Sequence, residues 1–133
     1  MPSLEKHPVE RYVNDSGRLS VIDYADLPFQ PVRQFWIEHV SPDGVRGQHA
    51  HRKCWQAFFL NGSGTCAFKA HFGPDEFQEG HLSLETPLYI AAPLTWLELK
   101  DFSPEACLTV LCSHAYDPND YIYDFQELKA LWG

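Results

Sequence analysis

Two histidines, His49 and His51, stand two residues apart in the segment Arg46-Gly47-Gln48-His49-Ala50-His51-Arg52, and their type and spacing suit proton-transfer chemistry. Side chains of an extended strand alternate between its two faces, so both imidazoles are predicted to lie side by side on one face. Each imidazole gains or releases a proton near neutral pH, as general acid–base catalysis requires. Gly47 shares that face and leaves room for a substrate, whereas Arg46 and Arg52 are expected on the opposite face or at the strand ends.

The same H-x-H spacing is typical of metal ligands on a barrel strand, so a metal site is the competing interpretation. Such metal sites usually add a carboxylate a few residues after the second histidine and a third histidine on a later strand. Here the first of these places holds Gln56, and the later segment 93–98 reads Pro-Leu-Thr-Trp-Leu-Glu, without a histidine. The residues therefore favour a proton-transfer site that uses no metal, and a metal-dependent enzyme stays the alternative.

Composition limits the classes of function. A chain of 133 residues fits one domain over 1–133, and its 44% of hydrophobic residues predict a folded core. The formal net charge of -8 argues against non-specific nucleic-acid binding, which needs a basic face. No apolar run approaches the roughly 20 residues of a membrane helix, and the first residues lack the apolar core of a signal peptide. We therefore expect a cytoplasmic protein that binds neither nucleic acid nor membrane.

The four cysteines form no C-x-x-C pair, so zinc-ribbon and thioredoxin-like sites are poorly supported. Each lies among apolar residues, which predicts buried, reduced thiols. They are Cys54, Cys66, Cys107 and Cys112.

The rest of the chain alternates short apolar runs with turn residues, the pattern of an antiparallel sandwich or barrel. Residues 1–8, with two prolines, are expected to form a loose arm. The runs 55–60 and 65–72, separated by Asn61-Gly62-Ser63-Gly64, are predicted to pair as a hairpin. Pro118-Asn119-Asp120 signals a helix start, and Phe125, Leu128 and Leu131 follow at helical spacing. Further strands are predicted over 9–13, 18–24, 32–40, 77–84, 87–91, 96–99 and 106–113.

These residues together resemble the sugar-nucleotide 3,4-ketoisomerases of the cupin superfamily, whose type activity is that of dTDP-4-keto-6-deoxyglucose 3,4-ketoisomerase. The resemblance rests on Arg46-Gly47-Gln48-His49-Ala50-His51-Arg52, on Gln56 and on Leu60-Asn61-Gly62-Ser63-Gly64. It extends to the early turn Asp15-Ser16-Gly17-Arg18-Leu19, to the segment 93–98 and to the C-terminal segments 101–103, 108–113 and 116–122. It spans about residues 9 to 126 in order.

The resemblance implies an all-β jelly-roll (cupin) antiparallel barrel with a short C-terminal helix, in a homodimer that often exchanges an N-terminal strand. It implies an isomerase without cofactor that moves a keto group from C4 to C3 of a dTDP-linked 6-deoxyhexose, in deoxyamino-sugar biosynthesis for a surface polysaccharide such as lipopolysaccharide O-antigen or for a secondary metabolite. On this basis we expect His49 to serve as carbon base and acid and His51 to move a proton between the oxygens, with the reverse division left open.

Substrate contacts are expected from cationic and polar side chains. Arg33 and Arg46 are the candidates for the diphosphate, because paired phosphates need cationic partners. Gln56 stands where metal-binding relatives carry a carboxylate, and Trp96 and Glu98 are expected to line the cavity. The remaining candidate is Arg18, which follows Gly17 where relatives place an arginine before that glycine.

The sequence departs from the family pattern at two places that bear on the substrate, and two other functions remain as alternatives. Ser16 stands before Gly17, and Phe35 and Trp36 stand where relatives often carry a tyrosine, so no hydroxyl is offered there. A metal-dependent cupin enzyme and a non-catalytic sugar-nucleotide binding module are the alternatives. Related 3,5-epimerases pair a histidine with a tyrosine and an aspartate, a combination that the sequence does not reveal.

Overall fold

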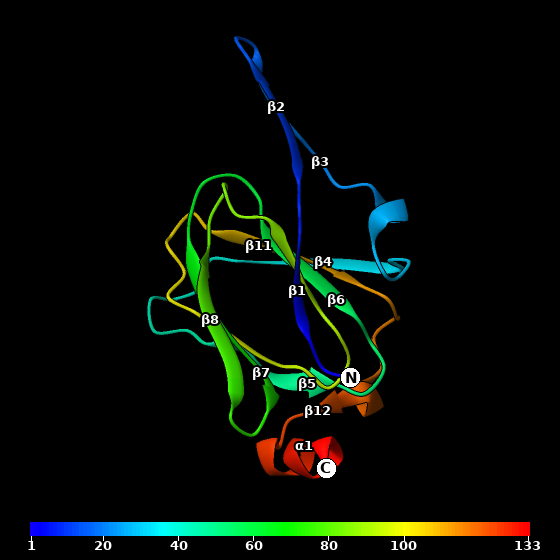
Figure 1. Ribbon diagram of the computed structural model, residues 1–133. Coiled ribbons are helices and arrows are strands. Elements are labelled where there is room, and N and C mark those ends of the chain that lie inside the picture. The colour runs from blue at the N-terminus through cyan, green and yellow to red at the C-terminus, as the bar shows by residue number, and fades with distance from the viewer.

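Two antiparallel sheets of five strands face each other in this computed structural model, which describes residues 1–133. The first sheet consists, in spatial order, of β1 (Leu4–His7), β9 (Leu88–Ala91), β6 (Gln56–Leu60), β11 (Cys107–Cys112) and β4 (Arg33–Glu38). The second consists of β12 (Tyr121–Ile122), β5 (Arg46–His51), β10 (Trp96–Lys100), β7 (Cys66–Gly73) and β8 (Glu76–Leu82). Figure 1 shows the sheets as the two walls of a jelly-roll barrel, so the predicted antiparallel barrel is confirmed.

Three further elements lie outside the barrel walls. A hairpin of β2 (Glu10–Asn14) and β3 (Gly17–Val21) projects away from the sheets at the top of Figure 1. A 3-10 turn, η1 (Tyr24–Asp26), leads back to β4, and a second one, η2 (Pro118–Asp120), precedes β12. The helix α1 (Phe125–Trp132) closes the chain beside β12 and β5. No helix combines the length and the apolar character needed to cross a lipid bilayer.

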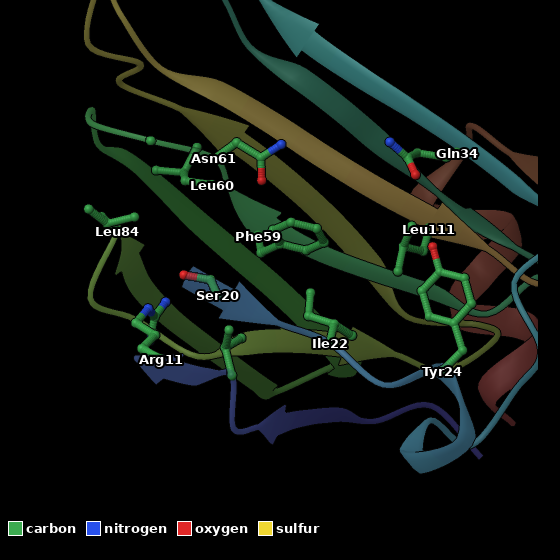
Figure 2. Close-up of a pocket in the computed structure, with 12 residues that line it drawn as sticks. Arg11, Ser20, Ile22, Tyr24, Gln34, Phe59, Leu60, Asn61, Leu84 and Leu111 are labelled. Atoms are coloured by element: carbon green, nitrogen blue, oxygen red, sulfur yellow. The ribbon is translucent and has the colours of Figure 1, made fainter. Parts of the chain in front are cut away.

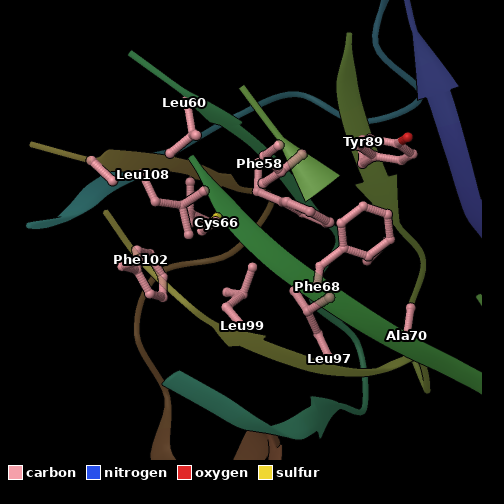
Figure 3. Close-up of a cluster of buried hydrophobic side chains, with 14 of the residues drawn as sticks. Phe58, Leu60, Cys66, Phe68, Ala70, Tyr89, Leu97, Leu99, Phe102 and Leu108 are labelled. Atoms are coloured by element: carbon pink, nitrogen blue, oxygen red, sulfur yellow. The ribbon is translucent and has the colours of Figure 1, made fainter. Parts of the chain in front are cut away.

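The main core lies between the two sheets, where apolar side chains of both walls interdigitate. Figure 3 shows Phe58 of β6 and Phe68 of β7 in contact from opposite sheets, with ring centroids 6.1 Å apart. Leu97 and Leu99 of β10 point into the same core, which identifies the inner face of that strand. Three of the four cysteines are buried and reduced, as the sequence predicted, whereas Cys107 is reduced but only partly buried.

The predicted hairpin of residues 55–60 and 65–72 is wrong. β6 pairs with β9 and β11, whereas β7 pairs with β8 and β10 in the opposite sheet. β6 is buried on nearly all of its length, as expected for a central strand with a neighbour on each side. The Asn-Gly-Ser-Gly turn therefore crosses between the walls and does not close a hairpin.

The expected loose arm at residues 1–8 instead contains β1, which pairs with β9 from Leu4 opposite Ala91 to His7 opposite Leu88. The free edge of β9 offers backbone donors and acceptors, and Leu4 packs against the main core. Ser3 fixes the start of the strand, because its amide donates to Thr95 Oγ1 at 3.0 Å.

The helix begins later than the sequence predicted. Pro118-Asn119-Asp120 forms the single turn η2 and leads into β12, which pairs with β5. α1 starts at Phe125, where the side chain of Asp124 caps the helix by accepting from the Gln126 amide at 2.9 Å. Leu128 of α1 packs on Trp96 and Ile122, so the helix covers the outer face of the sheet that carries the histidines.

Candidate active site

The interior face of β5 brings His49 and His51 together, with ring centroids 5.0 Å apart and ring planes at 89°. His49 lies opposite Leu97 of β10, which points into the core, and His51 lies opposite Tyr121 of β12. Directly paired residues of an antiparallel ladder share a face, so all four side chains point into the barrel. His51 is almost fully buried, and its Nε2 has no hydrogen-bond partner.

A β-bulge in β5 aims Arg46 into the barrel as well. Gly47 and Gln48 have φ angles of +83° and +59°, and the register with β10 shifts by one residue at this point. Arg46 consequently lies opposite Leu99, an inward-pointing residue, whereas strict alternation from His49 would have placed it on the outer face. The sequence predicted Arg46 on the opposite face or at a strand end. Arg46 is the first residue of β5, and the bulge turns it into the barrel and away from the outer face.

Gly47 is required by this bulge, and its replacement by alanine is expected to destabilise the protein. A Cβ at this position would lie 2.5 Å from the carbonyl oxygen of Leu97, on a backbone with φ of +83°. The combined clash and strain should lower the free energy of unfolding by about 2 kcal/mol or more. Urea denaturation measures this loss, and Gly62→Ala is the matched control, because Gly62 has φ of +71° with nothing within 4 Å. Equal losses in both variants would contradict this explanation.

Asp120 holds the ring of His51. The Nδ1 atom of His51 lies 2.9 Å from Asp120 Oδ2, and both side chains are largely shielded from solvent. The carboxylate also accepts hydrogen bonds from the backbone amides of Lys53 at 2.7 Å and Cys54 at 3.3 Å. A carboxylate only accepts, so it selects the tautomer with hydrogen on Nδ1 and leaves Nε2 with a free lone pair.

His49 is held in its neutral form. Burial lowers the pKa of His49 from 6.5 to about 4, with smaller contributions from the charges of His51 and Arg46. Its Nδ1 has no hydrogen-bond partner, although it is buried. A histidine that stays neutral throughout the physiological range is able to accept and return a proton without first losing one.

The lowered pKa of His49 predicts a loss of stability in mild acid. Between pH 6.5 and about 4 the unfolded chain binds a proton at this residue that the folded chain does not. The free energy of unfolding is therefore unaffected by His49 above pH 6.5 and decreases as the pH falls towards 4. Between pH 7 and 4.5 we expect the wild-type protein to lose on the order of 2 kcal/mol more than a His49→Asn variant. Urea unfolding at both pH values measures this difference, and parallel losses would contradict it.

A cavity of about 510 Å³ opens beside His49 between the two sheets. Arg33 of β4, Arg46 of β5 and Gln56 of β6 all line it, so the structure brings these three predicted residues to the histidine. Neither arginine makes an ion pair, and no carboxylate lines the cavity. The Arg33 guanidinium lies over the rings of Phe35 at 4.9 Å and Tyr116 at 5.5 Å, which fixes its position. The cavity is therefore a positively charged site in a protein of negative net charge.

Gln56 is buried at the floor of this cavity, where its Nε2 lies 3.7 Å from the sulfur of Cys112. Cys112 in turn lies beside Cys54, whose thiol pKa it lowers by hydrogen bonding. The weak sulfur acceptor leaves most of the hydrogen-bonding capacity of the Gln56 amide free for a ligand.

Two tyrosines complete the site, and the sequence did not single them out. Tyr121 packs against both histidines, with centroids 5.0 Å from His49 and 4.4 Å from His51, and Tyr123 stacks on it at 5.6 Å. Burial raises the pKa of Tyr121 above its ordinary value, and the nearby Arg33 opposes part of that rise. These side chains supply hydroxyl groups near the place where Phe35 and Trp36 offer none.

Three predicted contact residues lie away from the cavity. Leu97 and Leu99 point inward, so the alternating residues Trp96 and Glu98 point outward. The indole Nε1 of Trp96 donates a hydrogen bond to the Glu98 carboxylate at 2.8 Å. The expectation that these two line the cavity is therefore wrong. Arg18 lies on the β2–β3 hairpin, where it pairs with Glu85 at 3.0 Å. Arg52 points outward and pairs with Glu127 of α1.

A second cavity, of about 360 Å³, lies on the other side of the first sheet, under the β2–β3 hairpin. Figure 2 shows Phe59 and Leu111 of the sheet facing Ser20 and Ile22 of the hairpin segment across it. Its residues include neither histidine of the pair, so it is separate from the candidate active site.

The family follows from the sequence as a whole. Residues 4–132 match the protein family described as FdtA, WxcM-like, C-terminal. The chain belongs to this family. A TDP-4-oxo-6-deoxy-alpha-D-glucose-3,4-oxoisomerase from Aneurinibacillus thermoaerophilus is 33% identical over 125 residues, which cover 90% of this chain and 86% of that relative.

Solved structures of 3,4-ketoisomerases have the same fold. A mutant of the 3,4-ketoisomerase QdtA from Thermoanaerobacterium thermosaccharolyticum, in complex with TDP-4-keto-6-deoxyglucose, aligns with a TM-score of 0.87 at 28% identity, over 98% of this chain and 92% of that one. A 3,4-ketoisomerase from Helicobacter canadensis aligns with a TM-score of 0.89 at 25% identity, over 97% and 96%. The predicted family and the predicted class of enzyme, an isomerase, are confirmed.

Proposed function

We propose that this chain moves the keto group of a TDP-linked 4-keto-6-deoxyhexose from C4 to C3. The observation that carries the proposal is the pair of imidazoles 5.0 Å apart, beside a cavity with two arginines that have no carboxylate partner. The named activity of the 33% identical relative supports the same reaction and substrate class. The product would serve the biosynthesis of deoxyamino sugars.

The reaction is a double proton transfer. A base removes the proton on C3, which is acidic because it lies next to the C4 ketone, and the electron pair forms an enediolate with its charge on O4. The proton of the C3 hydroxyl then moves to O4, and a proton is delivered to C4. One hydrogen has moved from C3 to C4 and one from O3 to O4, so no oxidant or reductant is consumed. Two neighbouring imidazoles suit these two transfers.

His51 is the better candidate for the carbon base. Asp120 keeps hydrogen on its Nδ1, so the unpartnered Nε2 is the basic atom, and the carboxylate stabilises the imidazolium that forms. The same group is placed to return the proton to C4. This division reverses the one expected from the sequence, where both orders were left open.

His49 is then the group that moves a proton between O3 and O4. Its pKa of about 4 keeps it neutral, and a neutral imidazole is able to donate to one oxygen while it accepts from another. Neighbouring Tyr121, with a centroid 5.0 Å from that of His49, offers a further donor to the enediolate.

Arg33 and Arg46 are the proposed partners of the diphosphate. Replacement of Arg46 by alanine should raise the KM for the nucleotide sugar by roughly 10- to 100-fold, the effect of losing one charge-assisted hydrogen bond. The effect on kcat should be smaller, since the phosphates do not react. Steady-state kinetics measure both, with Arg52→Ala as the control, because Arg52 flanks the same strand but points to α1. An Arg46→Ala variant with an unchanged KM would contradict the proposal.

We also propose that the protein forms a homodimer. The β2–β3 hairpin stands away from the barrel and carries the exposed apolar side chains of Tyr12, Val13 and Leu19, which are 56%, 70% and 60% exposed. Exposed apolar groups on a projecting hairpin are typical of a surface that packs against a second copy. Light scattering should give twice the monomer mass, and a monomer at micromolar concentration would contradict this part of the proposal.

The activity itself is tested by turnover. The purified protein is incubated with TDP-4-keto-6-deoxyglucose, and the sugar signals are followed by NMR with and without a chelator. The expected result is a 3-keto product that forms at the same rate with and without the chelator. Loss of turnover with the chelator would favour the metal-dependent alternative, and saturable binding without turnover would favour a binding module.

A further inference from the structure

Three side chains of different chemistry converge on the side of His51 that faces away from its free Nε2. A ring nitrogen of His51, the sulfur of Cys54 and a carboxylate oxygen of Asp120 all lie within 4.8 Å of one another, and Nδ1 is the nitrogen that lies 2.9 Å from Asp120. Cys54 and His51 are 5% and 6% exposed. The chain turns after β5, which brings Cys54 back beside His51, three residues earlier in the sequence.

The backbone fixes this cluster in place. The amide of Arg52 donates to the backbone oxygen of Asp120 at 2.8 Å, and the amide of Lys53 donates to its side chain at 2.7 Å. The turn that carries Cys54 and the segment that carries Asp120 are thus joined by two hydrogen bonds. Donor atoms held in this way lose little conformational freedom when they bind an ion.

We propose that His51, Cys54 and Asp120 form a binding site for Zn²⁺, and that the bound ion stops the isomerase reaction. Nitrogen, thiolate sulfur and carboxylate oxygen are the three ligand types of zinc, with water in the fourth position. The sulfur and the imidazole favour zinc over magnesium or calcium, which prefer oxygen ligands.

The spacing requires only a small adjustment. In a tetrahedral zinc site, neighbouring donor atoms lie about 3.3 to 3.8 Å apart, as the usual metal–ligand distances imply. The three atoms here lie within 4.8 Å, so a pair at that limit has to close by roughly 1 Å, and the His51–Asp120 pair, at 2.9 Å, has to open by a few tenths of an ångström. Side-chain rotation of this size leaves the strands in place.

Zinc changes the tautomer of His51. The ion takes the lone pair of Nδ1, so the ring hydrogen moves from Nδ1 to Nε2, and Cys54 binds the ion as its thiolate. Nε2 then carries a hydrogen and has no lone pair with which to remove the C3 proton. The inhibition rests on the proposed function of His51, whereas the binding of zinc does not.

Binding is tested first, with Co²⁺ as a spectroscopic substitute for Zn²⁺ on the full chain. The expected result is a near-ultraviolet sulfur-to-cobalt absorption band, which one equivalent of Zn²⁺ removes. Cys54→Ala and Cys54→Ser should abolish the band and weaken zinc binding on the order of 100-fold. Cys107→Ser is the matched control and should keep both, because Cys107 is outside the cluster. A band that persists in folded Cys54 variants, or no band in the wild-type protein, would overturn the site.

Inhibition is tested second, by turnover with and without Zn²⁺. Zinc should inhibit the wild-type and Cys107→Ser proteins, and a chelator should restore their rate, while Cys54→Ala should turn over without inhibition. If cobalt binds through Cys54 but Zn²⁺ leaves the turnover rate unaffected, the inhibitory role is overturned and the metal site itself is still supported. A protein that binds cobalt through Cys54 but never isomerises the sugar would refute the proposed function and not the site.

Discussion

Replacement of His51 by asparagine is expected to lower kcat roughly 1,000-fold, the size of effect that loss of a general base produces. Asparagine fills part of the same space and keeps hydrogen-bonding groups there, but it has no nitrogen lone pair able to take the C3 proton. The KM and the affinity for TDP should change little, because the diphosphate is assigned to Arg33 and Arg46, which the substitution leaves in place. Steady-state kinetics together with a TDP titration measure this split.

The control for this prediction is the fold of the variant. His51 is buried, so the circular dichroism and the unfolding midpoint of the His51→Asn variant have to be compared with those of the wild-type protein before the kinetics are interpreted. A folded His51→Asn variant with kcat within tenfold of wild type would remove His51 from the role of base.

Replacement of Asp120 by asparagine is expected to lower kcat on the order of 100- to 1,000-fold. The amide NH₂ of asparagine is able to donate to Nδ1, which would stabilise the tautomer with hydrogen on Nε2 and block the base. Loss of the negative charge also removes the stabilisation of the imidazolium. The pH dependence of kcat should shift as well, a change that a purely structural role of Asp120 would not produce.

Two comparisons make the Asp120 result specific. Asp117→Asn is the matched control, because Asp117 lies in the same segment and only caps η2 through the Asn119 amide at 2.9 Å. The double variant of His51 and Asp120 should be no slower than His51→Asn alone, since the carboxylate acts through that imidazole. Independent, multiplicative losses would show that Asp120 acts in another way.

Most of the fold could be predicted from the sequence. Alternating apolar residues and Gly, Pro, Asn and Asp turns marked nearly every strand within a few residues, because these signals are local. Pairing was less predictable, since it depends on long-range packing. The segment 55–60 illustrates this: its turn resembles a hairpin turn, yet its apolar character on both faces is that of a central strand.

The candidate site was predicted in part. The spacing of His49 and His51 placed both rings on one face, and the resemblance led to Arg33, Arg46 and Gln56, which all line the cavity. Trp96 and Glu98 were expected there because of their segment, but the inward direction of Leu97 decides their face. Side-chain direction follows from register, and a bulge such as that at Gly47 changes it without a clear sequence signal.

Asp120 and Tyr121 escaped prediction because they are remote in sequence from the histidines. Asp120 lies 69 residues after His51 and was interpreted as part of a helix start. Only the pairing of β12 with β5 brings Tyr121 opposite His51 and the Asp120 carboxylate to its Nδ1. An acidic residue directly before an aromatic one in a turn was the available signal, and it is too common to indicate a catalytic pair.

The most direct test of the mechanism follows the hydrogen on C3. TDP-4-keto-6-deoxyglucose labelled with deuterium at C3 is incubated with the wild-type, His49→Asn and His51→Asn proteins, and the label is located by NMR. The wild-type protein should remove the label from C3 and either transfer it to C4 or release it to water, while His51→Asn should leave it on C3. Removal of the label by His51→Asn at the wild-type rate, or its retention by the wild-type protein, would contradict the assignment of His51 as the base.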